Sequence, residues 1–252
     1  MRSLRPTRRE TLLIGTAAVA MASGLPRLSQ AAPARPSELI DSPFLEQRVA
    51  TGKLPRVAQR VPDSPRIVAL TGDERVPGRH GGTMRMLMGD QRDIRMMTLY
   101  GYTRLVGYDD NLDLAPDVLE SFEVEAGRIF TLRLRPGHRW SNGAPFTTED
   151  FRYWWTHVAN NKRLSPGGPP QALLVGGEPP VFEVLSETEV RYSWSKPNPI
   201  FLPALAGAQP TYICMPSGYL KQFHIDFADP VTLQSRVRQA RVRDWGALHE
   251  RL

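Results

Sequence analysis

The chain has 252 residues, of which 41% are hydrophobic and 23% are charged, with 23 prolines, 20 glycines and one cysteine. This composition argues against disorder and against a long helical bundle, and the lone cysteine excludes an internal disulfide. The net charge of +6 comes mostly from the first 31 residues, so it gives no support for nucleic-acid binding.

The N-terminal 31 residues have the three-part layout of a signal peptide. A basic start is followed by a moderately apolar run over 11–25 and by small residues before the expected cleavage site. The pair Arg8-Arg9 resembles a twin-arginine signal, but Thr11 stands where that signal prefers a large apolar residue, so a Sec signal stays open. The run is short and weakly apolar for a membrane anchor. We therefore expect residues 1–31 to be removed and the mature protein to be periplasmic.

The next region is expected to be irregular and then to form strands. Residues 32–65 are polar and punctuated by proline, with one short amphipathic stretch at 44–49, and we predict an extended N-terminal segment. Apolar residues at 67–70 predict a buried strand. Residues 83–88 predict a second strand, because methionine recurs there at every other position.

A β-hairpin gives the clearest strand signal. Apolar residues alternate over 122–124 and over 130–134, and Ala126-Gly127 between them predicts the turn. A further alternating stretch at 190–194 predicts another strand.

Three helices are expected. The first covers 147–158, with Thr147 as N-cap and Asp150 three residues later in a capping-box pattern. A short one is predicted over 201–205. The last begins at an Asp-Pro pair and is predicted through about residue 242. Strands and helices thus mix without regular alternation, which indicates a mixed α/β fold.

Motifs for catalysis and metal binding are missing from the sequence. The five histidines have no metal-site spacing, and Cys214 lies in an apolar stretch typical of a core residue. A nucleophile elbow, a P-loop and a dinucleotide-binding glycine motif are all absent. The acidic loop 109–120 has ligand-type side chains at EF-hand-like positions, but Leu114 stands where glycine is needed. We interpret the loop as an exposed turn, with calcium as the alternative, and expect no metal, no cofactor and no enzymatic activity.

One long motif and several short ones run through residues 80–245. The long motif joins a strand ending in Pro136-Gly137 to the run WSNGAPFTTEDF. The short motifs lie at 80–83, 99–109, 114–124, 175–177, 197–199 and 215–220. Together they resemble the family 5 extracellular solute-binding proteins of ABC transporters, the dipeptide- and oligopeptide-binding group. Phe122 and Asn142 depart from the family pattern, where tryptophan and aspartate are usual.

The resemblance implies a fold like that of type II periplasmic binding proteins. The core of a first lobe is expected over 66–97 and 211–252, with an inserted subdomain over 98–210. Because family members are much longer, the second lobe is apparently missing from this sequence.

The resemblance also implies a function. The protein is expected to be the periplasmic, monomeric substrate-binding component of an ABC importer, which delivers peptides or similar solutes to the permease and meets the membrane only through it. In such proteins the lobes close around the solute by a hinge motion. The candidate solute-contacting residues follow the methionine-rich segment: Gly89, Asp90, Arg92, Met96 and Tyr100. Two alternatives remain, a secreted enzyme exported by the twin-arginine route and a truncated remnant that binds nothing.

Overall fold

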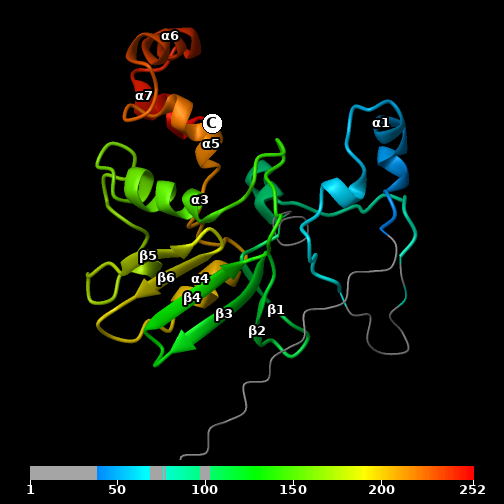
Figure 1. Ribbon diagram of the computed structural model, residues 1–252, viewed down its shortest axis with the longest axis horizontal. Coiled ribbons are helices and arrows are strands. Elements are labelled where there is room, and N and C mark those ends of the chain that lie inside the picture. The colour runs from blue at the N-terminus through cyan, green and yellow to red at the C-terminus, as the bar shows by residue number, and fades with distance from the viewer. Residues whose placement is uncertain (1–38, 69–75, 77, 97–102) are drawn as a thin grey trace, which may run out of the picture. The chain divides into compact units, whose positions relative to one another are not determined.

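The computed structural model describes residues 39–68, 76, 78–96 and 103–252 (Figure 1). The strands are β1 (Val106–Tyr108), β2 (Leu114–Pro116), β3 (Leu119–Glu125), β4 (Ile129–Leu134), β5 (Val181–Ser186) and β6 (Glu189–Ser193). The α-helices are α1 (Glu46–Ala50), α3 (Thr148–Tyr153), α4 (Phe201–Ala206), α5 (Ser217–Leu220), α6 (Pro230–Ala240) and α7 (Trp245–Glu250). The 3₁₀ segments are η1 (Pro43–Leu45), η2 (Val57–Gln59), η3 (Gln91–Met96), η5 (Gln171–Leu173) and η6 (Lys221–Phe223), and η4 (Trp154–Ala159) is a π-helix.

The structure confirms the predicted fold class, whereas the predicted signal peptide falls outside the residues that it describes. The predicted signal peptide, residues 1–31, lies outside them. Within the ranges that the structure describes, no helix is long and apolar enough to cross a membrane. The mixed α/β class is confirmed, since an antiparallel sheet and short helices share one hydrophobic core.

A four-stranded antiparallel sheet organises this core, with the strands in the order β3-β4-β6-β5. The predicted hairpin is confirmed as β3 and β4. Its turn residues Ala126 and Gly127 both have positive φ, 50° and 64°, and two such residues give a turn whose twist matches that of the paired strands. The predicted strand at 190–194 is confirmed as β6, which pairs with β4 on one side and β5 on the other.

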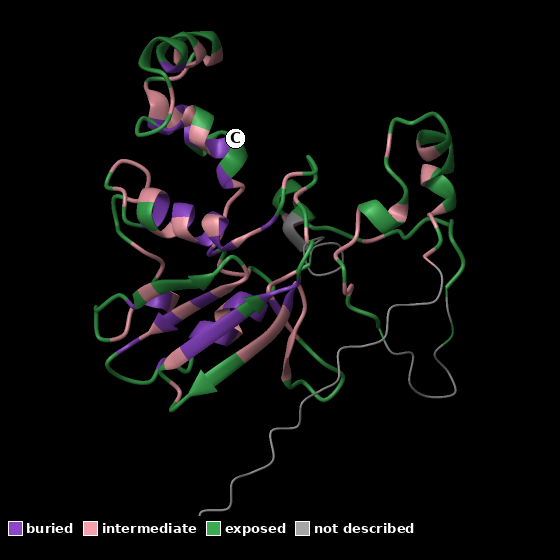
Figure 2. Ribbon diagram, in the orientation of Figure 1, coloured by how far each residue is buried: buried purple, intermediate pink, exposed green. Residues whose placement is uncertain are grey.

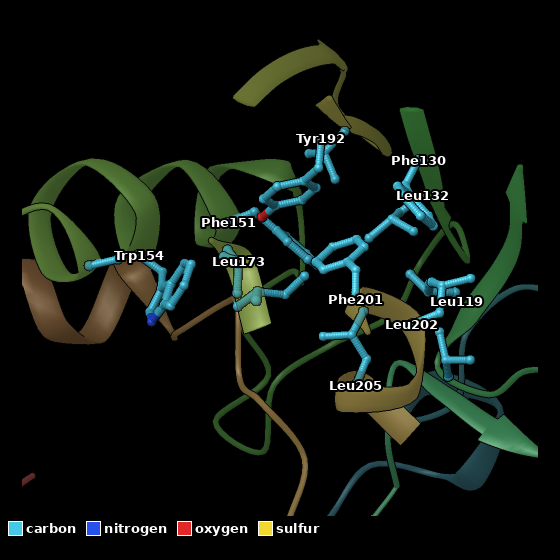
Figure 3. Close-up of a cluster of buried hydrophobic side chains, with 14 of the residues drawn as sticks. Leu119, Phe130, Leu132, Phe151, Trp154, Leu173, Tyr192, Phe201, Leu202 and Leu205 are labelled. Atoms are coloured by element: carbon cyan, nitrogen blue, oxygen red, sulfur yellow. The ribbon is translucent and has the colours of Figure 1, made fainter. Parts of the chain in front are cut away.

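One face of the sheet is buried beneath helices. Phe130 and Leu132 of β4 and Tyr192 of β6 point to this face and are at most 4% exposed. Phe201 of α4 lies against them, with its ring centroid 5.2 Å from those of Phe130 and Tyr192. Figure 3 shows Phe151 of α3 reaching the same cluster. Burying each such side chain contributes about 1.5–3 kcal/mol, so this cluster is the main source of stability.

The predicted helix at 147–158 begins as expected and then changes its winding. Thr147 is the N-cap, and the capping box with Asp150 is present. From Trp154 the α-helix α3 continues as the π-helix η4, which ends at Ala159 with Asn160 as its C-cap. The predicted helix at 201–205 is confirmed as α4. The last predicted helix is confirmed as α6, although it stops at 240.

The strands expected at 67–70 and 83–88 are wrong for the residues that the structure describes. Ile67 and Val68 are exposed and irregular, and the rest of the first stretch lies outside the described residues. The whole of 83–88 is irregular, with Met84, Leu87 and Met88 exposed. A strand needs a neighbour for its backbone hydrogen bonds, and the described residues provide none here.

The acidic loop after β1 is a tight turn in the hairpin formed by β1 and β2. Oδ1 of Asp109 accepts hydrogen bonds from the backbone N–H groups of Asn111 at 2.8 Å and of Asp113 at 2.9 Å. The carboxylate therefore stabilises its own turn, and the flanking segments are strands rather than helices. The interpretation as an exposed turn is confirmed for 109–113 and is wrong for the rest of the loop, where 114–116 form β2 and Leu119 begins β3.

Candidate functional site

Three of the predicted solute-contacting residues form one exposed turn at the start of η3. The carboxylate of Asp93 accepts hydrogen bonds from the backbone N–H groups of Gly89 and Asp90, both at 2.9 Å. Asp90 in turn accepts one from the Arg92 backbone N–H at 2.9 Å. That backbone bond, followed by the weaker one from the Arg92 guanidinium, lowers the pKa of Asp90 below its ordinary value. Acidic side chains thus fix the geometry of this turn.

The remaining two candidates are Met96 and Tyr100, of which the structure describes only the first. Met96 ends η3, in the same short stretch as Gly89, Asp90 and Arg92, and Tyr100 lies outside the described residues. The segment presents an ionised carboxylate and a guanidinium 3.5 Å apart at the surface. Such a pair can bind the charged amino and carboxylate groups of a peptide. The role of the five residues in binding stays a prediction.

Residues 103–105, which come after η3 in the sequence, line a cavity of about 540 Å³. Its apolar wall includes Trp140 and Ile213, and its polar groups include Arg104 and His138. A largely apolar cavity of this size with a few polar groups is typical of small-molecule sites. No sequence pattern indicated this cavity, because its lining residues come from segments far apart in the chain, among them 103–105, 138–141 and 210–214.

His138 is the one polar group of the cavity with an unused buried atom. Its Nδ1 is buried and has no hydrogen-bond partner in the part of the chain that the structure describes. Burial, and then the charge of Arg135, lowers the pKa of His138, so the ring is neutral near pH 7.

The wall of this cavity is held by a buried carboxylate. Oδ2 of Asp150 accepts hydrogen bonds from Trp140 Nε1 at 2.9 Å and from the Thr147 N–H at 3.1 Å. Its Oδ1 accepts from the Ser217 N–H at 2.8 Å and from Ser217 Oγ at 2.7 Å. One side chain thereby joins the 140–147 turn, the start of α3 and the start of α5. This network and the edge-on contact of Trp140 with Phe146 make the WSNGAPFTTEDF run a packed corner between β4 and α3.

A second cavity, of about 840 Å³, lies near the end of the chain. Trp154, Tyr219 and Leu252 are among its lining residues. Thr211 and Tyr212 line this cavity and the first one alike. Cys214 lines the first cavity and packs, partly buried, against the core. Burial raises the pKa of its thiol, which keeps the sulfur protonated and inert.

Comparison with known proteins places this architecture among the periplasmic binding proteins. A solved oligopeptide-binding protein, OppA, superposes with a TM-score of 0.68 and 28% identity over 85% of this chain and 33% of that one. The solved MelB from Agrobacterium fabrum C58, in complex with stachyose, matches with a TM-score of 0.50 and 20% identity over 76% of this chain and 31% of that one. The fold is therefore part of a lobe of a solute-binding protein.

Sequence comparison adds a family match over part of the chain. Residues 113–232 match the middle region of the bacterial extracellular solute-binding proteins, family 5. The periplasmic α-galactoside-binding protein of Rhizobium meliloti is 26% identical over 73% of this chain and 29% of its own length. The murein peptide-binding protein MppA of Escherichia coli is 34% identical over 25% of this chain and 12% of its own. Residues 113–232 are therefore similar to family 5, and the chain spans about a third or less of the length of these relatives.

Proposed function

We propose that this protein is the substrate-binding component of an ABC importer and that it binds peptides in the periplasm. The match of residues 113–232 to family 5 supports the transport role, since the relatives are periplasmic solute-binding proteins by name. The structural similarity to an oligopeptide-binding protein supports a peptide as the solute. That match has both a higher TM-score and a higher sequence identity than the match to MelB. The permease of the importer is the partner in this proposal, and the protein acts as a monomer without a cofactor and meets the membrane only through that permease.

In this proposal the turn at the start of η3 contributes to the solute cleft. Asp90 and Arg92 bind the charged groups of the peptide, and the backbone of Gly89 allows the main chain to approach. Met96 and Tyr100 provide apolar contact. The exposure of the Asp90 and Arg92 side chains supports this role, as does the acidic capping that keeps both in one turn.

A second candidate solute is an oligosaccharide. The relative matched over the largest share of this chain, 73%, is an α-galactoside-binding protein. An uncharged sugar would use the apolar and aromatic wall of the 540 Å³ cavity, including Trp140, more than the charged pair of η3. The two candidates therefore predict different sensitive residues.

Calorimetric titration of the purified chain distinguishes these functions. We expect a mixture of short peptides to bind and stachyose to give no heat. Arg92→Ala should weaken peptide binding about tenfold, as expected for loss of one charge-assisted hydrogen bond. The control Arg79→Ala removes another exposed positive charge, ten positions before Gly89 in the sequence. It should leave peptide binding unchanged.

The other outcomes each contradict the proposal in a different way. Binding of stachyose that is sensitive to Trp140→Ala would favour the oligosaccharide. Chemically altered peptides, detected by mass spectrometry after incubation with the protein, would favour the alternative that the protein is a secreted enzyme. Absence of heat with either class would support the remnant that binds nothing.

Export to the periplasm has its own test. Residues 1–31 fused to a reporter should carry it across the inner membrane, and Arg8→Lys with Arg9→Lys should block export if the twin-arginine route is used. Continued export of that double variant would show a Sec signal instead.

A further inference from the structure

Two histidines and one aspartate meet where the π-helix η4 faces the loop before α6. His157 belongs to η4, whereas His224 and Asp226 follow η6. Nδ1 of His157 lies 3.0 Å from Oδ2 of Asp226, and Nδ1 of His224 lies 3.7 Å from the same oxygen. One atom from each of the three side chains lies within 4.8 Å of the other two. The first histidine is far from the others in sequence, which explains why spacing gave no signal for this cluster.

The hydrogen bonds of His224 fix which of its ring nitrogens is unprotonated and turn that nitrogen toward Asp226. Its Nε2 lies 3.0 Å from the carbonyl oxygen of His157, which can only accept, so Nε2 carries the proton and donates it. Nδ1 is therefore unprotonated and faces Asp226. It accepts a hydrogen bond from the backbone N–H of Asp226 at 3.2 Å. A ring nitrogen fixed by a backbone carbonyl on its far side is the usual arrangement of a metal-binding histidine.

The cluster combines a rigid interior with access from solvent. The His224 side chain is fully buried, that of His157 is 18% exposed and that of Asp226 is 51% exposed. Phe227 packs edge-on against the ring of His157, with centroids 4.6 Å apart. The ring of Tyr153 stacks on that of His157, with centroids 5.8 Å apart. The neighbouring His249 is already bound, because its Nε2 lies 2.8 Å from the Tyr153 hydroxyl.

We propose that His157, His224 and Asp226 form a binding site for a divalent transition-metal ion such as Zn²⁺. Two imidazole nitrogens and one carboxylate are a common ligand set for Zn²⁺, with water at the open position. Bond lengths of about 2.0–2.2 Å require ligand atoms closer together than the widest separation seen here. The partly exposed side chains of His157 and Asp226 can turn inward to achieve this. The metal takes the lone pair of His224 Nδ1 in place of the hydrogen bond from the Asp226 N–H. His157 binds through Nδ1 after its proton, which Nδ1 donates to Asp226 Oδ2 in the metal-free chain, has moved to Nε2.

Such an ion would link two segments that otherwise meet through hydrogen bonds and ring contacts. It would bind η4 to the 224–226 loop and so fasten the C-terminal helices α6 and α7 to the core. The site is separate from the predicted solute-contacting turn and does not depend on the proposed transport function. A ligand that binds only the folded chain stabilises it in proportion to the logarithm of its concentration.

The test is titration of the purified full chain with Zn²⁺, followed by calorimetry and thermal unfolding. We expect one equivalent to bind and the midpoint of unfolding to rise. Co²⁺ in place of Zn²⁺ should give visible absorption bands typical of nitrogen and oxygen ligands. Asp226→Asn and His157→Gln should each weaken Zn²⁺ binding about tenfold or more. These two variants retain the shape of side chains that are at least partly exposed, so both should fold.

The controls separate this site from adventitious binding. His80→Ala removes an exposed histidine elsewhere and should leave the affinity unchanged. His224→Asn should abolish binding, and its circular dichroism without metal shows whether it folds. The proposal is overturned if the wild-type chain binds no Zn²⁺, or if Asp226→Asn and His157→Gln bind as tightly as the wild type.

Discussion

The strand β4 and the segment 83–88 have nearly the same alternating sequence pattern, yet only β4 forms a strand. Phe130 and Leu132 in β4 are 4% and 0% exposed, whereas Met84 and Leu87 are 67% and 101% exposed. Figure 2 shows the same contrast, with buried residues gathered in the central strands and α4. Alternation specifies which face a strand would bury, and it does not provide the neighbour that makes the strand.

The difference lies in backbone pairing. β4 pairs with β3 on one side and β6 on the other, so its N–H and C=O groups are used on both edges. Its apolar face is then covered by α4. Residues 83–88 have neither a paired strand nor a covering helix among the described residues. Apolar side chains on an unpaired segment gain little burial, so they cannot offset the entropy of ordering it.

The largest effect expected from this contrast is on the free energy of unfolding. Phe201→Ala should lower it by about 3–5 kcal/mol, because a fully buried ring is replaced by a cavity under the sheet. Leu87→Ala should change it by less than about 0.5 kcal/mol. Urea unfolding of both variants, followed by tryptophan fluorescence, gives the comparison. Similar losses for the two would show that 83–88 packs in solution as β4 does.

The buried Asp150 should have the next largest effect. Asp150→Asn places an amide NH₂ against donors, because the two carboxylate oxygens accept from Trp140, Thr147 and Ser217. We expect a loss of about 2–3 kcal/mol, the cost of leaving buried donors without an acceptor. Glu123→Gln on β3, which is exposed, is the matched control with little effect. A neutral Asp150→Asn result would mean that the corner is held by packing alone.

Local signals predicted the elements whose causes are local. The positive-φ turn at Ala126-Gly127, the capping box at Thr147 and the Asp-Pro start of α6 each depend on a few adjacent residues. Strand β5 was missed because it lies at a sheet edge and is mostly exposed, and an irregularity between Val184 and Ser186 breaks its alternation.

The features that sequence reasoning missed depend on contacts between distant segments. Asp150 was recognised as a helix-capping residue, but its bonds to Ser217 come from a segment 67 positions away. The pairing of His157 with Asp226 likewise spans 69 positions. The predicted site residues around Asp90 were close in sequence, so the turn that contains them could be anticipated, whereas their role in binding could not be tested by geometry.

A smaller effect is expected from the cap of α3. Thr147→Ala removes the side-chain oxygen that accepts from the Glu149 N–H at 3.3 Å, and we expect a loss of about 1 kcal/mol. Thr147→Ser keeps the oxygen and should lose much less. Thermal unfolding of the pair measures the difference. If both variants lost the same amount, the methyl group of Thr147 rather than its hydroxyl would be the stabilising part.

The smallest effect should come from Glu149, and it should depend on pH. Its side chain binds Arg152 and Lys221, each at 2.6 Å, and so links α3 to η6. The hydrogen bond from Arg152, then that from Lys221, holds the pKa of Glu149 below its ordinary value of 4.5. A lowered pKa in the folded state means that the unfolded state binds the proton more readily, so this stabilisation is present above pH 4.5 and is lost as the pH falls below it. Because the groups are partly exposed, Glu149→Gln should cost about 1 kcal/mol or less at pH 7. The difference from wild type should vanish in urea unfolding at acid pH, and a difference that persisted there would show that shape, rather than charge, is what Glu149 contributes.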